Sequence, residues 1–515
     1  MSIPGLGQIP VQNTASALRT VKLAPLSEWR FAVTQPPVKI RLLSGTAERD
    51  GTELASSQTY SFIGTQSKIL TWHGCEIEID GSCDSEELVV GGVKHGQGST
   101  NGAQLSPMIS YMNLHLLLAS KRASAACVPR GSPGSTGPRL LVCGPPSSGR
   151  TSLVRTLAAW ATKMSSYAPL PKQEASRQPP PAQYQQPCVI NVDPREAMLS
   201  LPGTLSAAVF ATLMDLETEG SYGWGGAPSS GPSAVPVKLP LVYNFGYARP
   251  SDAPDLYRGL VTRLAGAVSA RMSEDATVEA SGLLIDTPAM TADEENNSNH
   301  LMTIESLVHI IEEFSVNLVV VLGAGSESNA IHQALTSRFS GESTTLGEPV
   351  QIVQLDASDG VVSRSDSIEQ RQREACIKEY FFGDAKRTLS PYTQQVDADT
   401  LTVFRLPPAD NADSDGFGEN DDGNSGEEEG AIGEHNLEKV EAGPSLAHWT
   451  LAVMNADLHD PPDVIQHAAV LGFVYVAEFD TERRKVRVLA PVSGRIGDRP
   501  LVFGKWPEPN INLVG

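Results

Sequence analysis

Residues 144–151 read GPPSSGRT, which matches the phosphate-binding pattern G-x-x-x-x-G-K-[ST] at every fixed position except the lysine. A loop of this kind binds phosphate because consecutive backbone N–H groups and the N-terminus of the following helix surround the anion. The two glycines permit the turn, and Thr151 is placed to put its hydroxyl on Mg²⁺. The pattern predicts a phosphate site formed by Gly144, Ser147, Ser148, Gly149, Arg150, Thr151 and Ser152.

Arg150 stands where the pattern has its lysine. Arginine keeps the positive charge, but its head group is planar and forked, whereas that of lysine is a compact point charge. We expect phosphate binding to survive this exchange, and the geometry that follows a γ-phosphoryl group through its transfer to be lost. The loop alone leaves three interpretations open: a working transfer site, a phosphate-binding site without chemistry, and a chance arrangement of small residues.

Two aspartates end apolar runs downstream of the loop. CVINVDP contains Asp193, which could act as a general base or hold Mg²⁺-bound water, and GLLIDTP contains Asp286, which could be the Walker-B acid. Either aspartate could instead cap the helix or turn that follows it. The chain has no Asn-Lys dipeptide, so the guanine-reading signature of GTPases is missing and adenine is favoured by elimination. We therefore expect ATP and Mg²⁺ as ligands.

The elements that must position these residues begin near residue 105. Ser106 and Pro107 open a helix as its N-cap and first residue. From residue 139 onward, apolar runs such as RLLVC and LVVVL alternate with helical segments, which is typical of a parallel sheet covered on both faces. The sequence predicts a doubly wound P-loop domain over residues 105–400, with a disordered Pro/Gln-rich insert at 165–187.

Two smaller β domains flank this central domain. Residues 1–104 contain short strands such as CEIEID, in which apolar and acidic side chains alternate. Between residues 409 and 434 there are ten Asp and Glu and no Lys or Arg, so residues 401–446 are expected to be a solvated linker or insert, with an acidic recognition tail as the alternative. Strand-like runs resume in a small β-rich domain at 447–515.

Length and composition favour a soluble protein of several domains and disfavour a non-specific nucleic-acid-binding or membrane-spanning one. A chain of 515 residues is too long for one core, and 40% hydrophobic with 19% charged residues is ordinary for a soluble protein. The net charge of −21 disfavours non-specific nucleic-acid binding, so any RNA contact should be weak, local or supplied by a partner. Six scattered cysteines without a CxxC pair favour a reducing intracellular compartment. No apolar run approaches the length of a membrane span.

Several motifs occur together in a specific order. GTEL, YMNLHLLL, the P-loop, NVDP, SGLLIDTP and LGFVYVAEFDTERRKVRVLAPVSGR follow one another along the chain. This order resembles the fungal form of the Clp-type subunit of the pre-mRNA cleavage and polyadenylation machinery, within the polynucleotide 5′-hydroxyl kinase family. The resemblance implies an N-terminal β-sandwich, a central P-loop domain and a small C-terminal domain. It also implies that Glu28 and Lys68 contact the adenine; either could instead be an exposed loop charge.

The same resemblance implies four requirements for kinase activity, and this chain departs from each. The P-loop lysine is Arg150, and the Asp-x-x-Gln/His motif keeps Asp193 but ends in Glu196. The Thr-x-Gly-Trp clasp keeps Thr287 but has Ala289 and Met290 in place of its glycine and tryptophan. Of the two lid arginines, which are five residues apart, the first is Arg364 and the second is replaced by Glu369. Arg371 and Arg373 are nearby but out of register. A glutamate in place of a lid arginine reverses a charge needed in the transition state, and losing the tryptophan removes a stacking platform for RNA.

These departures favour a structural role over an enzymatic one. We expect ATP to stay bound and to stabilise an arrangement of domains that docks the scaffold subunit of the cleavage factor, which contacts the RNA polymerase II tail. Other cleavage and polyadenylation subunits are further expected partners, and the resemblance implies a nuclear location. The alternatives are an RNA 5′-hydroxyl kinase, with Asp193 as base and Arg150 and Arg364 on the γ-phosphate, and an ATP-hydrolysing switch.

Overall fold

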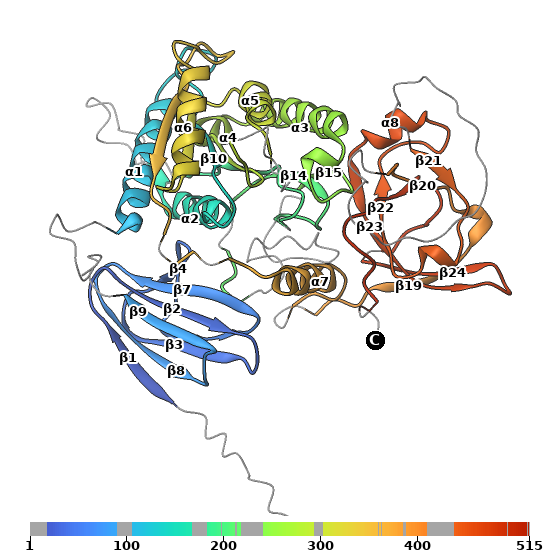
Figure 1. Cartoon of the computed structure of the whole chain (residues 1–515), viewed down its shortest axis with the longest axis horizontal. Coiled ribbons are helices and arrows are strands. Elements are labelled where there is room, and N and C mark those ends of the chain that lie inside the picture. Colours follow the sequence, from blue (N-terminus) through green and yellow to red (C-terminus); the bar gives the residue numbers. More distant parts are fainter. Residues whose placement is uncertain are drawn as a thin grey trace, which may run out of the picture. The chain divides into compact units, whose positions relative to one another are not determined.

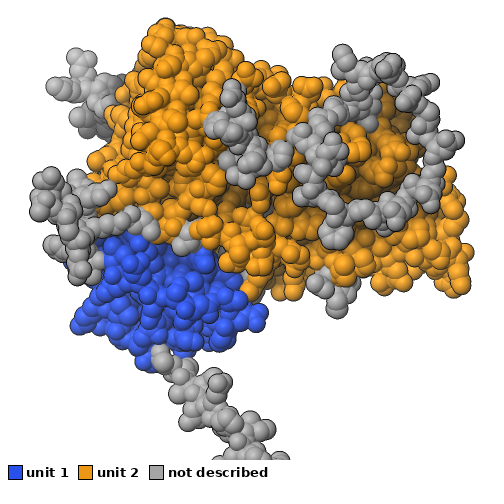
Figure 2. Space-filling model, in the orientation of Figure 1, with its two compact units in different colours: residues 1–105 blue, residues 106–515 orange. Residues whose placement is uncertain are grey.

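The computed structural model divides the chain into two compact units, residues 1–105 and 106–515 (Figure 2). The structure describes residues 18–89, 106–166, 183–196, 198–211, 214–217, 240–292, 302–358, 360–361, 363–384, 388–408, 437–491, 493–511 and 513.

The first unit consists of two antiparallel sheets (Figure 1). One has the order β1-β8-β3-β6, formed by Arg19–Leu23, Cys75–Asp80, Val38–Gly45 and Thr59–Phe62. The other has the order β5-β4-β7-β2-β9, formed by Thr52–Glu53, Glu48–Arg49, Thr65–Thr71, Ser27–Val33 and Ser85–Val89. Apolar side chains alternate with polar ones along β3 and β8, and Phe31 of one sheet meets Phe62 of the other with ring centroids 5.4 Å apart. The core therefore lies between the sheets, and the predicted β-sandwich is confirmed.

The second unit is built on a seven-stranded sheet of order β15-β14-β13-β16-β10-β17-β18. Its strands are Leu241–Asn244, Thr204–Val209, Cys188–Asn191, Leu283–Asp286, Arg139–Cys143, Leu318–Leu322 and Gln351–Leu355. The five strands from β13 to β18 run parallel, and β14 runs antiparallel to its neighbours. Every residue of β10, β13, β16 and β17 is buried, so both faces of the sheet are covered. This is the doubly wound architecture that the apolar runs predict.

Helices and short elements complete the central part of the second unit. They are α1 (Pro107–Ala126), α2 (Arg150–Lys163), η1 (Pro250–Asp252), α3 (Pro254–Glu274), α4 (Ala276–Ser281), α5 (Ile304–Glu313), α6 (Ser326–Arg338), α7 (Asp366–Phe382), β11 (Ser165–Ser166) and β12 (Gln183–Tyr184). The Ser106 side chain caps α1 by accepting from the N–H of Met108, with Pro107 in the first turn, as the sequence predicts. Within the described ranges, no helix has the length and hydropathy needed to cross a bilayer.

A second seven-stranded sheet forms the C-terminal part of this unit, in the order β19-β24-β23-β22-β25-β20-β21. Its strands are Tyr392–Asp397, Lys485–Ala490, Val470–Asp480, Thr450–Met454, Leu501–Phe503, Val403–Arg405 and Glu438–Val440. Pairing is antiparallel throughout except between β20 and β25, and η2 (Ala398–Thr400), η3 (Pro444–Leu446) and α8 (Pro462–Gln466) lie in the connections. The predicted β-rich domain is thus present.

Two segments contain strands that the sequence does not predict. In the predicted insert at 165–187, β11 and β12 pair with each other; residues 167–182 lie outside the described residues. The predicted acidic linker at 401–446 contributes β20 and β21 to the C-terminal sheet, which begins at β19 rather than near residue 447. These strands have only three residues, too few to show an alternating pattern in the sequence. Residues 409–436, with the acidic tract, lie outside the described residues.

Several contacts join the C-terminal sheet to the P-loop part, among them the bridge between Tyr243 and Ala469 and the hydrogen bond from the Tyr247 hydroxyl to the Pro407 carbonyl. The carbonyl oxygen of Gly246 accepts hydrogen bonds from the N–H groups of Lys505 and Trp506, at 2.9 and 3.1 Å. The second half of α7 bridges both parts, because the Tyr380 hydroxyl accepts from the N–H of Phe473 at 2.9 Å and the thiol of Cys376 donates to the Ser200 carbonyl at 3.8 Å. Helix α7 is thereby fixed at its C-terminal end.

Candidate nucleotide-binding site

The P-loop connects the end of β10 to the start of α2. Gly149 is the N-cap of α2 with a φ of 88°, a left-handed conformation that a residue without Cβ adopts readily. A Cβ at Gly144 would stand 2.8 Å from the Leu322 carbonyl oxygen, so this position also requires glycine. No side chain caps the N-terminus of α2, and the buried Ser148 hydroxyl has no hydrogen-bond partner. Unengaged donors at a helix N-terminus are suited to binding an anion.

Arg150 folds back onto the loop that precedes it. Its Nη1 donates to the carbonyls of Gly144 and Pro145 at 2.9 and 2.6 Å, and its Nε donates to the Thr287 carbonyl at 3.1 Å. The guanidinium group thus ties the P-loop to the end of β16. Three carbonyl contacts need the forked donors of arginine, which a single ammonium group does not reproduce.

Thr151 and Asp286 meet at the carboxyl ends of β10 and β16. The Thr151 hydroxyl donates to Oδ2 of Asp286 at 2.6 Å, while Oδ1 is buried without a hydrogen-bond partner. Burial raises the pKa of Asp286 to about 8, because it outweighs the opposing effects of the Arg150 charge and the Thr151 hydrogen bond. The side chain does not cap a helix or turn through any hydrogen bond found among the described residues.

Asp193 lies in a tightly bonded loop after β13. Its backbone N–H donates to Oδ1 of Asn191, and its Oδ1 accepts from the N–H of Arg195, both at 3.0 Å. Asn191 Nδ2 also donates to the carbonyls of Asp193 and Glu196, so one buried amide fixes the whole turn. Burial, and then the negative charge of Glu196, raises the pKa of Asp193 to about 6 against the pull of Arg150. Asp193 thus bonds to the turn that follows it, which is the alternative interpretation, and its role as a base or as a holder of Mg²⁺-bound water stays a prediction.

The sequence reasoning did not single out Asn191. Its signal is the spacing within NVDP, where an asparagine precedes an aspartate by two residues. Such a side chain commonly bonds to the backbone two residues further on and forms a turn.

The acidic residues fit a nucleotide-bound Mg²⁺ rather than a metal held by the chain alone. Among the described residues, no cluster of three or more His, Cys, Asp or Glu could hold a metal ion. Mg²⁺ in nucleotide sites needs only one or two protein ligands, because phosphates and water supply the rest. The unpartnered Oδ1 of Asp286 and the adjacent Thr151 hydroxyl are such a small donor set.

The predicted clasp residues are parts of the core. Thr287 is buried and donates to the carbonyl of Val142 at 3.0 Å. Met290 is fully buried, its N–H donates to the Gly144 carbonyl at 3.2 Å, and Ala289 accepts from the N–H of Met302. The side chain at position 290 therefore packs inward and offers no surface on which a base could stack.

The residues matching the lid form two ion pairs with the Asp193 loop. Arg364 Nη2 lies 2.5 Å from Oε1 of Glu196, and Arg195 Nη2 lies 2.6 Å from Oε2 of Glu369. Burial alone would raise the pKa of Glu196, but the charge and hydrogen bond of Arg364, with smaller effects of Arg150 and Arg195, lower it below its ordinary value. Glu196 is therefore an ionised partner of Arg364.

The two out-of-register arginines do not both approach this site. Arg373 lies over the Trp506 ring, 4.2 Å from its centroid, and pairs with Glu508 at 2.6 Å in the C-terminal part. Arg371 is a partly buried residue of α7.

Two serines of the predicted phosphate site are exposed. Ser147 has a φ of 54°, and the carbonyl of Ser152 accepts a hydrogen bond from the Thr156 hydroxyl.

Glu28 and Lys68 lie together on the five-stranded sheet of the first unit. Lys68 Nζ is 3.1 Å from Oε1 of Glu28, and Arg30 Nη2 is 3.0 Å from Oε2 of the same carboxylate. Glu28 is buried and engaged by two cations, of which the sequence reasoning missed Arg30. Lys68 is opposite Arg30 in the β2–β7 register, so the pairing of these two strands builds the cluster.

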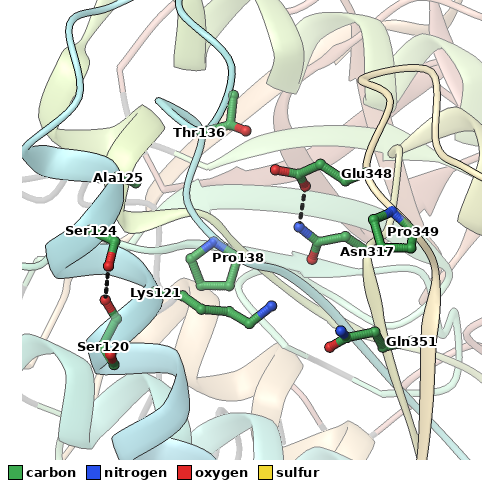
Figure 3. A pocket seen from close by; sticks show the side chains of 11 residues that line it. Ser120, Lys121, Ser124, Ala125, Thr136, Pro138, Asn317, Glu348, Pro349 and Gln351 are labelled. Carbon is green, nitrogen blue, oxygen red and sulfur yellow. Dashed lines mark hydrogen bonds between the residues drawn. The ribbon is translucent and has the colours of Figure 1, made fainter.

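A pocket of about 290 Å³ lies at the other end of the central sheet (Figure 3). It is bordered by Lys121 and Ser124 of α1 and by Pro138, Asn317 and Gln351, which stand at or just before the first residues of β10, β17 and β18. Glu348 holds the Asn317 amide in its wall. Ligands of open α/β sheets bind at the carboxyl ends of the strands, so this pocket is not the nucleotide site.

Three family models match the chain in succession. An N-terminal β-sandwich domain of polyadenylation factor matches residues 22–125, the mRNA cleavage and polyadenylation factor CLP1 P-loop matches 181–383, and pre-mRNA cleavage complex II protein Clp1 matches 389–508. Relatives named mRNA cleavage and polyadenylation factor CLP1 include one from Pyricularia oryzae, 46% identical, and one from Botryotinia fuckeliana, 41% identical, each alignment covering 100% of both chains.

Two solved structures share the fold over nearly the whole chain. One is a complex of wild-type Clp1p with a fragment of Pcf11p, with a TM-score of 0.75, 26% identity, and coverage of 95% of this chain and 98% of that one. The other, with the same TM-score and identity and coverage of 95% and 99%, describes an extended interface between Pcf11p and Clp1p and the structural basis for ATP loss in a glycine-to-arginine point mutant.

Proposed function

The chain belongs to the CLP1 family of mRNA cleavage and polyadenylation factors, and we propose that it holds ATP at the P-loop without transferring the γ-phosphate. The bound nucleotide stabilises the arrangement of domains on which a Pcf11-type scaffold subunit docks. A ligand that binds only the folded state stabilises that state by mass action and needs no turnover to do so.

Nucleotide binding is supported by the donors left unengaged at the P-loop. The N-terminus of α2 lacks a side-chain cap, and the Ser148 hydroxyl and Asp286 Oδ1 are buried without partners. Buried polar groups are normally hydrogen-bonded, so three unengaged sites in one place indicate a ligand. When bound, Mg²⁺ would neutralise phosphate charge, with Thr151 and Asp286 as the residues that hold it. Glu28 and Lys68 are the proposed adenine contacts of the first unit.

One observation supports the proposal that the γ-phosphoryl group is not transferred, namely the ion pair between Glu196 and Arg364. Arg364 is the only lid arginine in register, and its charge is directed to a carboxylate whose side chain is 11% exposed. Arg150, the cation of the P-loop itself, is engaged by three carbonyls. Transition-state stabilisation needs positive groups aimed at the transferring phosphoryl group, and both candidates are directed elsewhere.

The partner and location follow from the family. The solved relative binds Pcf11p, so a protein of that type is the proposed docking partner, with other cleavage and polyadenylation subunits around it. A factor that processes mRNA 3′ ends works in the nucleus, which is the proposed location. We propose that RNA is reached mainly through partners, because a net charge of −21 gives little attraction for phosphate.

The decisive experiment has two arms. Protein purified without added nucleotide is denatured and its supernatant chromatographed; stoichiometric ATP is expected, and an empty supernatant together with no binding of added ATP would contradict the proposal. Labelled ATP is then incubated with a 5′-hydroxyl oligonucleotide, and no labelled product is expected.

A second candidate is an RNA 5′-hydroxyl kinase. The observation that favours it is the buried carboxyl of Asp193, whose pKa is raised to about 6 and therefore suits a general base near neutral pH. Transfer of label to the oligonucleotide, abolished in Asp193→Ala, would establish this activity and exclude the first proposal.

A further inference from the structure

Two ion pairs join the region at the start of α7 to the Asp193 loop, and each segment supplies the cation of one pair and the anion of the other. The adjacent residues Arg195 and Glu196 carry opposite charges, and each meets its complement: Arg195 pairs with Glu369 at 2.6 Å, and Glu196 pairs with Arg364 at 2.5 Å. The resemblance makes Glu196 and Glu369 two separate departures from the kinase pattern. In this chain each of them has an ionic partner.

The part of the lid that carries these charges has no fully buried residue among those that the structure describes. The fully buried residues of α7 all lie in its second half, at Cys376, Ile377, Tyr380 and Phe381. None of the described residues from 363 to 375 is fully buried. The ion pairs of Arg364 and Glu369 are therefore contacts that keep residues 363–372 on the Asp193 loop.

The same segment reaches the P-loop at its other end. A Cβ built on Gly149 would stand 3.2 Å from Cγ2 of Val361, so the Val361 side chain lies against the phosphate loop. On the opposite side, Asn191 holds the Asp193 loop rigid through hydrogen bonds to the carbonyls of Asp193 and Glu196. Val361 and the ion-paired residues Arg364 and Glu369 thus lie at the two loops that border the proposed nucleotide site, and the ionic partners are on a fixed support.

We infer that the Arg195–Glu369 and Glu196–Arg364 ion pairs are a latch that holds residues 363–372 beside the bound nucleotide and slows its release. The inference rests on the proposed function, because a latch of this kind acts only when ATP occupies the site. Once phosphoryl transfer is not required, the lid no longer has to open in each cycle, and charges that fasten it retain the ligand.

The direction in which one substitution changes nucleotide binding distinguishes the latch from ordinary charge repulsion. Glu369 places a negative charge near a site for a polyphosphate, so removing that charge by itself should make nucleotide binding tighter. The latch requires the reverse, since Glu369→Gln breaks the pair with Arg195 and frees the start of α7.

The test measures release of a fluorescent ATP analogue from the full-length chain in Mg²⁺, after mixing with excess unlabelled ATP. Glu369→Gln and Arg195→Gln are each expected to speed release by about two- to fivefold, the range of one partly exposed ion pair. The double variant should be no faster than the faster single variant, because both changes break the same pair. Glu374→Gln is the matched control: it removes the same charge from the same helix and leaves both pairs intact.

Three results would overturn the latch. Release from Glu369→Gln that is unchanged, slower, or equal to that from Glu374→Gln would show that the pair does not retain the nucleotide. A double variant whose acceleration equals the product of the single effects would show that the residues act independently. If the wild-type chain binds no analogue at all, the proposed function fails together with the latch, whereas binding with equal release from all variants rejects the latch alone.

Discussion

The hydroxyl of Thr151 donates to Oδ2 of Asp286 at 2.6 Å, which joins the first turn of α2 to the end of β16. The second carboxylate oxygen, Oδ1, is buried and unpartnered. One hydroxyl oxygen and one carboxylate oxygen are thus held together at the P-loop. Such a small donor set suits a Mg²⁺ ion whose remaining ligands are phosphate oxygens and water.

Thr151→Val is expected to weaken ATP binding by roughly tenfold or more in Mg²⁺ and to change it little in EDTA, because the hydroxyl acts through the metal. Binding is measured by titration of a fluorescent ATP analogue under both conditions. Thr151→Ser keeps the hydroxyl and should retain most of the affinity. An equal loss in EDTA would assign Thr151 a packing role instead.

Arg150→Lys restores the P-loop pattern, and we expect it to leave phosphoryl transfer undetectable. Glu196, Met290 and Glu369 still depart from the kinase pattern, so the restored lysine lacks the groups that would act with it. Transfer of labelled phosphate to a 5′-hydroxyl oligonucleotide is the measurement. Product formed by Arg150→Lys but not by the wild type would show that Arg150 alone blocks the chemistry.

The same substitution should also loosen the loop. A lysine cannot reproduce all three carbonyl contacts of Arg150, and we expect the free energy of unfolding to fall by about 1–3 kcal/mol. Urea denaturation of the nucleotide-free chain measures the change, and an undiminished stability would contradict this account.

Lys68→Gln tests the proposed adenine contact in the first unit. We expect the affinity for ATP to fall by roughly three- to tenfold, the effect of one lost polar contact, while binding of GTP stays the same. Lys39→Gln, an exposed lysine on the other sheet of the sandwich, is the control for net charge. Equal losses for ATP and GTP would mean that Lys68 acts on charge and not on the base.

His115 makes the second unit sensitive to acid. It is buried on α1 with its Nε2 3.1 Å from Sδ of Met164, and burial, with the charges of Arg122 and Lys163, lowers its pKa to about 4. Between pH 6.5 and 4 the unfolded chain therefore binds a proton that the folded chain does not, and the free energy of unfolding falls as the pH falls. The full contribution is about 3 kcal/mol.

His115→Leu should remove this part of the pH dependence. Urea denaturation at pH 7 and pH 4.5 is expected to show a smaller decline for the variant than for the wild type. His332→Leu, at a partly buried histidine of α6, is the control and should decline like the wild type. Parallel declines for His115→Leu and the wild type would contradict the assignment.

Arg373→Met tests how firmly α7 is attached to the C-terminal part. Its side chain is 13% exposed, pairs with Glu508 and lies over Trp506, so we expect a loss of about 1–3 kcal/mol in the free energy of unfolding. Arg338→Met removes an arginine that is 43% exposed and paired with Glu312 and Glu342, and should cost at most about 1 kcal/mol. Equal costs would mean that the contacts with Trp506 and Glu508 add no more than those of an exposed arginine, which itself lies over the Phe339 ring.

The fold and the positions of the two acids beside the P-loop could be predicted because their signals are local in the sequence. Buried strands such as β10 and β16 are uninterrupted apolar runs, and Asp286 and Asp193 lie at or just after the carboxyl ends of such runs. In parallel strands these ends meet at one edge, so the runs themselves place both acids near the P-loop.

The rest depends on contacts between distant segments. The pairs Glu196–Arg364 and Arg195–Glu369 join residues 168 and 174 positions apart, and a sequence read position by position shows Glu196 and Glu369 only as departures from a motif. The contacts of Arg150 are equally hidden, because its acceptors are backbone carbonyls that any residue provides. The short strands β20 and β21 lack a pattern of their own and become strands only by pairing within the C-terminal sheet.

The hydrogen bonds from Lys505 and Trp506 to the Gly246 carbonyl affect how the chain is made. Synthesis proceeds from the N-terminus, so the strands around the P-loop leave the ribosome long before these two residues exist. The nascent P-loop part must therefore wait, with the Gly246 carbonyl not yet bonded, until the last segment emerges. A message truncated before codon 505 would release a product that carries the complete phosphate loop but lacks the segment that bonds to Gly246.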